Sequence, residues 1–147
     1  MIHSHIGNLD EAISYLDKTI NLDPNDHESK YILGQIQLYK KKFKEGWKNY
    51  ESRWLCKYFK EKKFFSSKPL LTNLDNLNNV FLWSEQGIGD QIMYGSMINQ
   101  FSKLCNKLTV RLDERLIKLF DKKNPDIKFI GKKDTINDSE FDHHMSL

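Results

Sequence analysis

The chain has 147 residues, 39% of them apolar and 29% charged, a balance typical of a globular protein and not of a disordered one. Its net charge of +3 is too small to indicate nucleic-acid binding. The sequence shows no secretory pattern, and no apolar run approaches the roughly 20 residues that cross a bilayer, so we expect a cytoplasmic protein without a membrane span.

The first part of the chain, residues 1–54, is predicted to be helical. Apolar residues recur at spacings of three and four over 9–20, and Pro24 ends that segment. A second helix is expected over 31–38, and a third, rich in aromatic residues, over 43–54.

A shift of 34 residues aligns the first and third of these helices. It places Ala12 on Gly46, and Leu16 on Tyr50, so that small and large residues coincide. This period with a helix-turn-helix pattern is the signature of a tetratricopeptide repeat, and residues 1–54 would hold about one and a half repeats. A plain helical hairpin stays the alternative, because about three repeats are needed for independent stability.

Residues 55–79 are predicted to be a connector. Five lysines alternate there with aromatic residues, namely Lys57, Lys60, Lys62, Lys63 and Lys68 with Tyr58, Phe59, Phe64 and Phe65. Such interleaving can bind single strands by stacking. We favour a solvated lysine face with aromatic side chains packed between two domains, and expect no nucleic-acid partner.

The remainder, 80–147, is predicted to be α/β. Strand formers occupy 80–83, 108–112 and 127–130, and 141–147 would begin a fourth strand. Helical segments separate them, the first with an apolar stripe of Met93, Met97, Phe101 and Leu104. Alternating strands and helices indicate a partial Rossmann-like parallel sheet.

One loop carries plausible chemistry: Gly87-Ile88-Gly89-Asp90, between the first strand and its helix. Glycines lack Cβ atoms, so backbone N–H groups there can approach an anion at the positive end of the helix. Asp90 has two interpretations. It either caps free N–H groups in the first turn or points a carboxylate into a crevice as a general base.

Other ligands fit the pattern less well. In a dinucleotide fingerprint Ile92 would stand where a small residue packs against the strand, although Asp113 resembles the ribose-binding acid. Neighbouring His143 and His144 would point to opposite faces of a strand, so no joint metal site is expected. Cys56 and Cys105 form no Cys-x-x-Cys pair, and we predict no metal.

Two stretches resemble a known family. Gly46-Trp47-x-x-Tyr50-Glu51-x-Arg53-Trp54 and Leu82-Trp83-Ser84-Glu85-Gln86-Gly87-Ile88-Gly89-Asp90-Gln91-Ile92 are similar to bacterial tetratricopeptide-repeat proteins fused to a glycosyltransferase domain related to lipopolysaccharide heptosyltransferases. Residues 141–147 also look like the segment entering that family's fourth strand.

The resemblance implies the N-terminal half of a GT-B fold, in which two Rossmann-like domains face each other. It implies that Asp90 deprotonates an acceptor hydroxyl, and that Gln86, Gly87, Ile88 and Gly89 bind substrate. The donor would be a nucleotide sugar that transfers a hexosyl or heptosyl group, with no cofactor or metal required.

The chain ends before the family's donor domain, so we expect a truncated or split gene product. The predicted function is a glycosyltransferase fragment that is inactive alone and needs a missing C-terminal donor domain. The alternative is a non-catalytic module whose helical repeats bind a protein or peptide.

Overall fold

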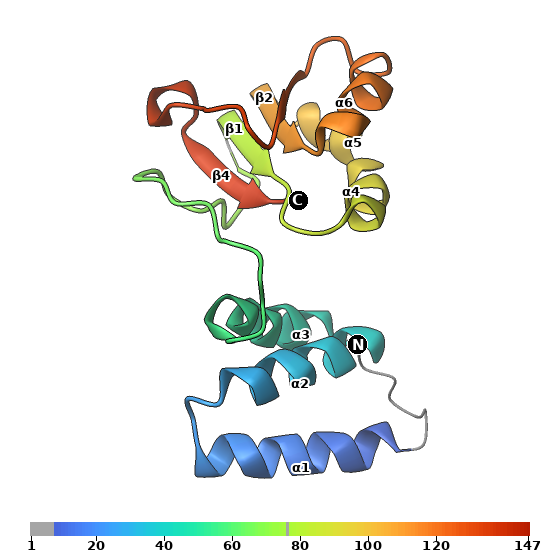
Figure 1. Cartoon of the computed structure of the whole chain (residues 1–147), viewed down its shortest axis with the longest axis vertical. Coiled ribbons are helices and arrows are strands. Elements are labelled where there is room, and N and C mark those ends of the chain that lie inside the picture. The colour runs from blue at the N-terminus through green and yellow to red at the C-terminus, as the bar shows by residue number, and fades with distance from the viewer. Residues whose placement is uncertain (1–7, 76) are drawn as a thin grey trace. The chain divides into compact units, whose positions relative to one another are not determined.

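The computed structural model describes residues 8–75 and 77–147. The chain divides into two compact units, Met1–Lys62 and Lys63–Leu147. The first unit is helical, and the second holds a four-stranded parallel sheet with helices (Figure 1). The expected α plus α/β class is therefore confirmed. The boundary between the units falls inside the stretch 55–79 that the sequence marks as a connector.

The described part of the first unit, residues 8–62, contains the α-helices α1 (Leu9–Leu22), α2 (His27–Tyr39) and α3 (Phe43–Tyr50) and the 3-10 turn η1 (Glu51–Leu55). Side-chain caps begin two of them, since Asn8 accepts from the Glu11 amide and Asp26 accepts from the Ser29 amide. The α-helix expected over 43–54 is shorter than predicted, because its last turn tightens into η1.

Glycines set the close crossing of α2 and α3. A Cβ built on Gly34 would lie 2.5 Å from the backbone nitrogen of Tyr50, and one on Gly46 would lie 2.9 Å from the Leu38 side chain. The backbones therefore approach as closely as they do because neither position carries a side chain. This agrees with the small residue expected at Gly46 and adds Gly34 as its neighbour across the crossing.

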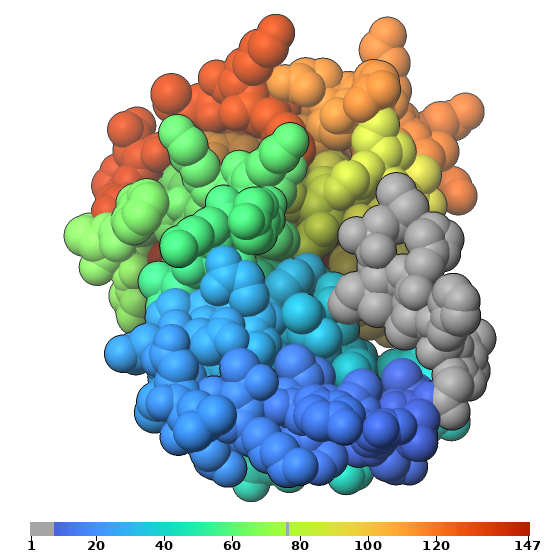
Figure 2. Space-filling view, turned by 60° about the horizontal axis from the view of Figure 1, so that its bottom comes forward, coloured from blue at the N-terminus to red at the C-terminus, as the bar shows by residue number. Residues whose placement is uncertain are grey.

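Helix α1 buries less of its surface than α2 and α3 do. None of its residues is buried, and its apolar stripe, including Leu9, Leu16 and Ile20, is only half-buried against α2. In Figure 2 α1 (dark blue) crosses the near face of the helical unit with its outer side open. Within the first unit α2 lies between α1 and α3 (Figure 1), so the amphipathic pattern of α1 is satisfied from one side only.

The second unit alternates strands and helices over its described residues, 63–75 and 77–147. In chain order they are β1 (Leu77–Trp83), α4 (Ile88–Gly95), α5 (Ile98–Ser102), β2 (Cys105–Leu112), α6 (Glu114–Asp121), β3 (Lys128–Gly131), η2 (Asp138–Glu140) and β4 (His143–Ser146). All strand pairs are parallel, in the order β3-β2-β1-β4. The four expected strands are confirmed, and the first begins at Leu77 instead of Val80.

The helices cover one face of this sheet. Alternate residues of β1 and β2, such as Val80, Leu82 and Val110, pack with Ile98 and Phe120 from the helices. All of these side chains except Phe120 are at most 2% exposed. They form the core of the second unit, because parallel strands must bury both faces.

The predicted apolar stripe is wrong for Met93, Met97 and Leu104, which are exposed, whereas Phe101 packs against the core as expected. The segment breaks into α4 and α5, and Met93 and Met97 are 56% and 53% exposed. Gly95 and Ile98 are buried instead. A ring carbon of Phe120 would lie 2.5 Å from a Cβ on Gly95. The side of α4 that carries Gly95 therefore packs against α6.

An aromatic cluster covers the opposite face. The Phe64 ring lies 5.0 Å from Phe81, 6.2 Å from Phe141 and 5.4 Å from His144. Phe59 belongs instead to the first unit, where it packs on Tyr31. The expectation that the connector aromatics pack between domains is therefore wrong for these two residues, because each is used inside one unit.

The connector also protects a sheet edge. Segment 69–71 runs parallel to β4, with the Leu71 amide donating to the His144 carbonyl at 2.8 Å and the His144 amide to the Pro69 carbonyl at 3.2 Å. Asp138 fixes the preceding turn by accepting from the hydroxyls of Ser66 and Ser67. Segment 69–71 thus occupies the edge of the sheet beside β4.

Candidate functional site

The sheet has a topological switch point between β1 and β4. From β1 the chain moves outward through β2 to β3 and then returns to place β4 on the other side of β1. In parallel sheets ligands bind outside the carboxyl ends of the strands at such a point. The loop after β1 lies there, and the Leu147 amide, just past β4, donates to the Trp83 carbonyl at 2.9 Å.

The structure places Gly87 in the loop after β1 but Gly89 and Asp90 in the first turn of α4, and both glycines are exposed to solvent. Gly87 is the extended residue that precedes α4, and no side chain caps this helix. A Cβ on Gly89 would meet no atom within 4 Å, and one on Gly87 would meet only the Asp90 carboxylate, at 3.8 Å. The chain's own packing therefore does not require glycine at these two positions.

Asp90 is half-buried in the first turn of α4. Within residues 8–75 and 77–147, its carboxylate accepts no hydrogen bond that would satisfy the helix amides. Its carboxylate stands beside the Gly87 backbone, where a bound hydroxyl could reach both.

The other predicted binding residues differ in their environments. Ile88 is partly buried and packs against the core of the second unit. The Gln86 carbonyl accepts a hydrogen bond from the Gln91 side chain at 2.8 Å. Gly87 and Gly89 are the exposed members of the set.

Gln91 is the site residue that sequence reasoning missed. It is 2% exposed, and its Oε1 accepts from the Asp113 amide at 2.8 Å while its Nε2 donates to the Gln86 carbonyl. One buried amide thus ties the loop after β1 to the end of β2. No local pattern marked this residue, because Gln91 follows the charged Asp90 in a polar first turn, and only the tertiary structure shows what it binds.

The carboxylate of Asp113 is bound by Arg115. It accepts from the Arg115 amide at 3.1 Å and forms a bidentate ion pair with the Arg115 guanidinium, at 2.8 and 2.9 Å. These contacts lower the pKa of the Asp113 carboxyl well below its usual range. Ile92 is 47% exposed, so the expected crowding of the helix–strand packing by this side chain is wrong.

Two polar side chains at this end of the sheet are shielded from solvent, Glu85 fully and Arg111 in part. Glu85 is 5% exposed in the loop itself. Arg111, near the end of β2, stacks its guanidinium over Phe64 and Phe81 at 5.2 and 5.0 Å and donates to the Asp134 carbonyl. Burial lowers the pKa of Arg111, and the aromatic rings offset part of the cost of burying its charge.

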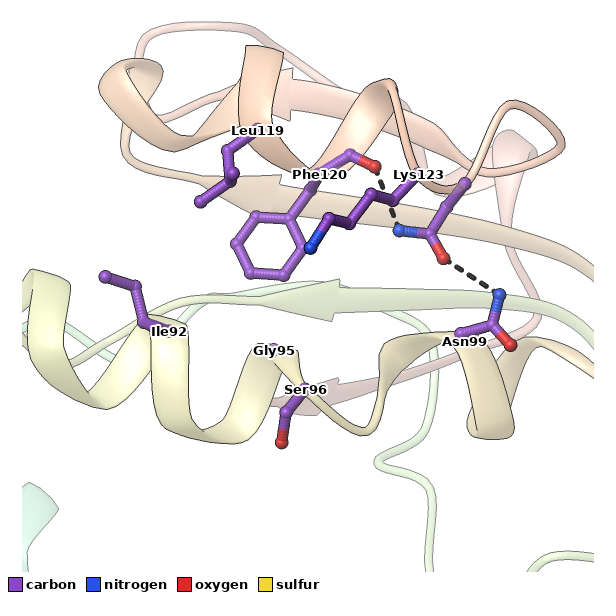
Figure 3. Close-up of a pocket in the computed structure, with 8 residues that line it drawn as sticks. Ile92, Gly95, Ser96, Asn99, Leu119, Phe120 and Lys123 are labelled. Carbon is purple, nitrogen blue, oxygen red and sulfur yellow. Dashed lines mark hydrogen bonds between the residues drawn. The ribbon is translucent and has the colours of Figure 1, made fainter.

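A separate groove of about 480 Å³ lies between α4, α5 and α6 (Figure 3). Its lining is Ile92, Gly95, Ser96, Asn99, Leu119, Phe120, Lys123 and Asn124. Asn99 donates to Asn124, which in turn donates to the Phe120 carbonyl. The groove does not include residues 86–90, so it is distinct from the glycine loop.

His143 and His144 lie on opposite sides of β4, as predicted, and His144 is buried while His143 is only partly so. No cluster of three or more metal-ligating side chains occurs among the residues that the structure describes. In the same part of the chain no helix is long and apolar enough to cross a membrane. Comparison of the chain with protein-family models, curated proteins and solved structures finds no match.

Proposed function

We propose that this chain carries the acceptor side of a sugar-transfer site, as part of a glycosyltransferase-like protein. The observation that supports this most is the position of Gly87-Ile88-Gly89-Asp90, which joins the carboxyl end of β1 to the first turn of α4 beside the switch point. The resemblance of this loop to bacterial glycosyltransferases with tetratricopeptide repeats supplies the reaction class. The proposal includes a GT-B arrangement with a donor domain outside the described residues.

In this proposal Asp90 is the general base. Its half-buried carboxylate takes the proton from an acceptor hydroxyl as that oxygen attacks the anomeric carbon of the donor sugar. The bond from the anomeric carbon to the nucleotide phosphate breaks, and the nucleotide leaves with the bonding electrons. Gly87 and Gly89 let the sugar approach the backbone closely, and Gln91 holds the loop in place.

A second candidate function is protein recognition by the helical unit. It is favoured by the close glycine crossing of α2 and α3, which fits the small positions of a tetratricopeptide repeat. The half-buried apolar stripe of α1 adds a surface that a further repeat or a peptide would cover. This role is compatible with sugar transfer, since the two surfaces belong to different units.

The test is an NMR titration of the isotope-labelled chain with monosaccharide acceptors and nucleotide sugars. The chemical shifts of the backbone amides are measured at each ligand concentration. We expect saturable shifts of the Gly87 and Gly89 amides with the acceptor sugar, weakened in Asp90→Asn. Asp126→Asn is the matched control, because this exposed carboxylate precedes β3 at the opposite end of the sheet. Shifts confined to the α4–α6 groove, or equal binding by both variants, would contradict the proposal.

Turnover supplies the second readout. When the chain is joined to a donor-binding domain that restores transfer, Asp90→Asn should lower the rate by about 10²–10⁴-fold, the usual contribution of a general base. Asp126→Asn should leave the rate unchanged. Full turnover in Asp90→Asn would remove Asp90 from the mechanism.

A further inference from the structure

The first unit is electrically polarised along its sequence. Residues 8–30, which include α1, hold six acidic residues and two lysines. Residues 39–62, which include α3, hold nine basic and three acidic residues, although the whole chain carries only +3. Such a charge asymmetry within one small unit is typical of a protein that meets an anionic surface from one side.

Aromatic side chains stand among these lysines on α3. Phe43 and Trp47 are 58% and 48% exposed and lie one helical turn apart, so they form a single row. Lys44 and Lys48, both exposed, form the adjacent row, and exposed Lys41 precedes the helix. We call these five residues the basic-aromatic face.

This face is presented by a fixed helix and not by a flexible tail. Gly46 holds α3 against Leu38 of α2 at close range, and the Trp47 ring packs edge-on to Tyr50 at 5.5 Å. Lys40, by contrast, is paired with Asp10 and is not part of the face. The exposed aromatic row therefore keeps its position relative to the lysines.

The residue types distinguish a lipid surface from a nucleic acid. Trp and Phe favour the membrane–water interface, where lysines add diffuse attraction to anionic headgroups. Nucleic-acid phosphates and bases are read best by the planar fork of arginine. The single arginine of 39–62, Arg53, is 2% exposed, bonded to Glu51 and stacked on Tyr50 and Trp54, so it cannot serve that purpose.

From these observations we propose that the basic-aromatic face docks the chain on an anionic lipid bilayer. The lysines provide long-range attraction, and Phe43 and Trp47 enter the headgroup region. Association is peripheral, because α3 is one short helix of eight residues. This inference concerns the first unit alone and does not depend on sugar transfer.

The test is flotation of the full chain with vesicles of phosphatidylcholine, with and without phosphatidylglycerol, alongside tryptophan fluorescence. We expect binding only to the anionic vesicles, lost at high salt, with a blue shift that is absent in Trp47→Phe. Each lysine near an anionic surface contributes about fivefold to the affinity. Replacing Lys41, Lys44 and Lys48 together by Gln should therefore weaken binding by about a hundredfold.

Matched variants separate this face from general charge. The triple replacement of Lys103, Lys118 and Lys122 by Gln removes the same charge from exposed positions in the second unit and should leave binding unchanged. Phe43→Ser with Trp47→Ser should reduce binding at least tenfold, whereas Tyr15→Ser on α1 should not. Helical content by circular dichroism verifies that each variant folds.

Three results would overturn the proposal. One is equal binding to neutral and anionic vesicles. Another is equal loss of binding in the two lysine variants, which would indicate net charge without a defined face. The last is tighter binding to a single-stranded oligonucleotide than to anionic vesicles, unaffected by the two serine replacements, which would indicate a nucleic-acid surface.

Discussion

The Trp83 indole donates a hydrogen bond from Nε1 to Nδ1 of His144, at 3.1 Å, and joins the last residue of β1 to β4 inside the second unit. Both side chains are 3% exposed. Because Nδ1 accepts, the neutral imidazole must carry its proton on Nε2. Protonating Nδ1 would set two N–H donors against each other, so this contact requires the neutral form.

The first prediction concerns pH. Burial lowers the pKa of His144 below its usual value, so the unfolded chain binds a proton more readily than the folded one. Stability of the second unit should therefore be full above pH about 6.5 and fall as the pH drops from there through the lower folded-state pKa. The denaturant midpoint, followed by near-UV circular dichroism at each pH, measures this.

His144→Gln removes the titrating group, so its denaturant midpoint should change much less over the same pH range, from a lower starting stability. His143→Gln is the comparison, since it removes the neighbouring histidine and leaves the Trp83 contact in place. An unaltered pH slope in His144→Gln would show that another group is responsible.

The second prediction concerns the tie between the loops. Gln91→Leu has a similar volume but leaves the Gln86 carbonyl and the Asp113 amide without their partner. We expect a loss of about 1–3 kcal/mol in the free energy of unfolding of the second unit, because unpaired buried polar groups are costly. Urea denaturation measures it.

For comparison, Gln100→Leu changes an exposed glutamine on α5 and should alter stability by less than about 0.5 kcal/mol. If the two variants have the same stability, the Gln91 amide does not hold the loops together. A shift of the Gly87 amide resonance only in Gln91→Leu would show directly that the loop has moved.

The third prediction concerns the crossing of α2 and α3. Gly34→Ala would place a Cβ 2.5 Å from the Tyr50 nitrogen, a backbone atom that cannot turn away. The helices must separate, and we expect a loss of about 1–3 kcal/mol in the first unit. Thermal unfolding by far-UV circular dichroism measures it.

Gly89→Ala provides the opposite case, because a Cβ there meets no atom within 4 Å and the residue is helical. It should be neutral or stabilise the second unit by up to about 1 kcal/mol. A Gly34→Ala protein as stable as the parent would mean that the backbones are not in contact at this crossing.

Local patterns determined much of the secondary structure. The apolar spacing of α1, the β-rich run at Val80 and the glycines at the start of α4 each act over a few residues, so the sequence alone identifies these elements. The same reasoning located the loop of Gly87 to Asp90, because a strand, two glycines and a helix in succession define such a turn. It failed where burial depends on a distant partner, as for Met93 and Met97, which are exposed because α6 packs on Gly95.

Only the tertiary structure decided where β4 pairs and what Gln91 and the connector bind. No local pattern specifies that β4 returns to the free side of β1, which creates the switch point beside the glycine loop. Segment 69–71 has few strand signals, yet it pairs with His144 because β4 offers unpaired edge groups there. The chain therefore encodes its elements through short-range preferences, whereas the position of the site follows from hydrogen bonds between residues far apart in sequence.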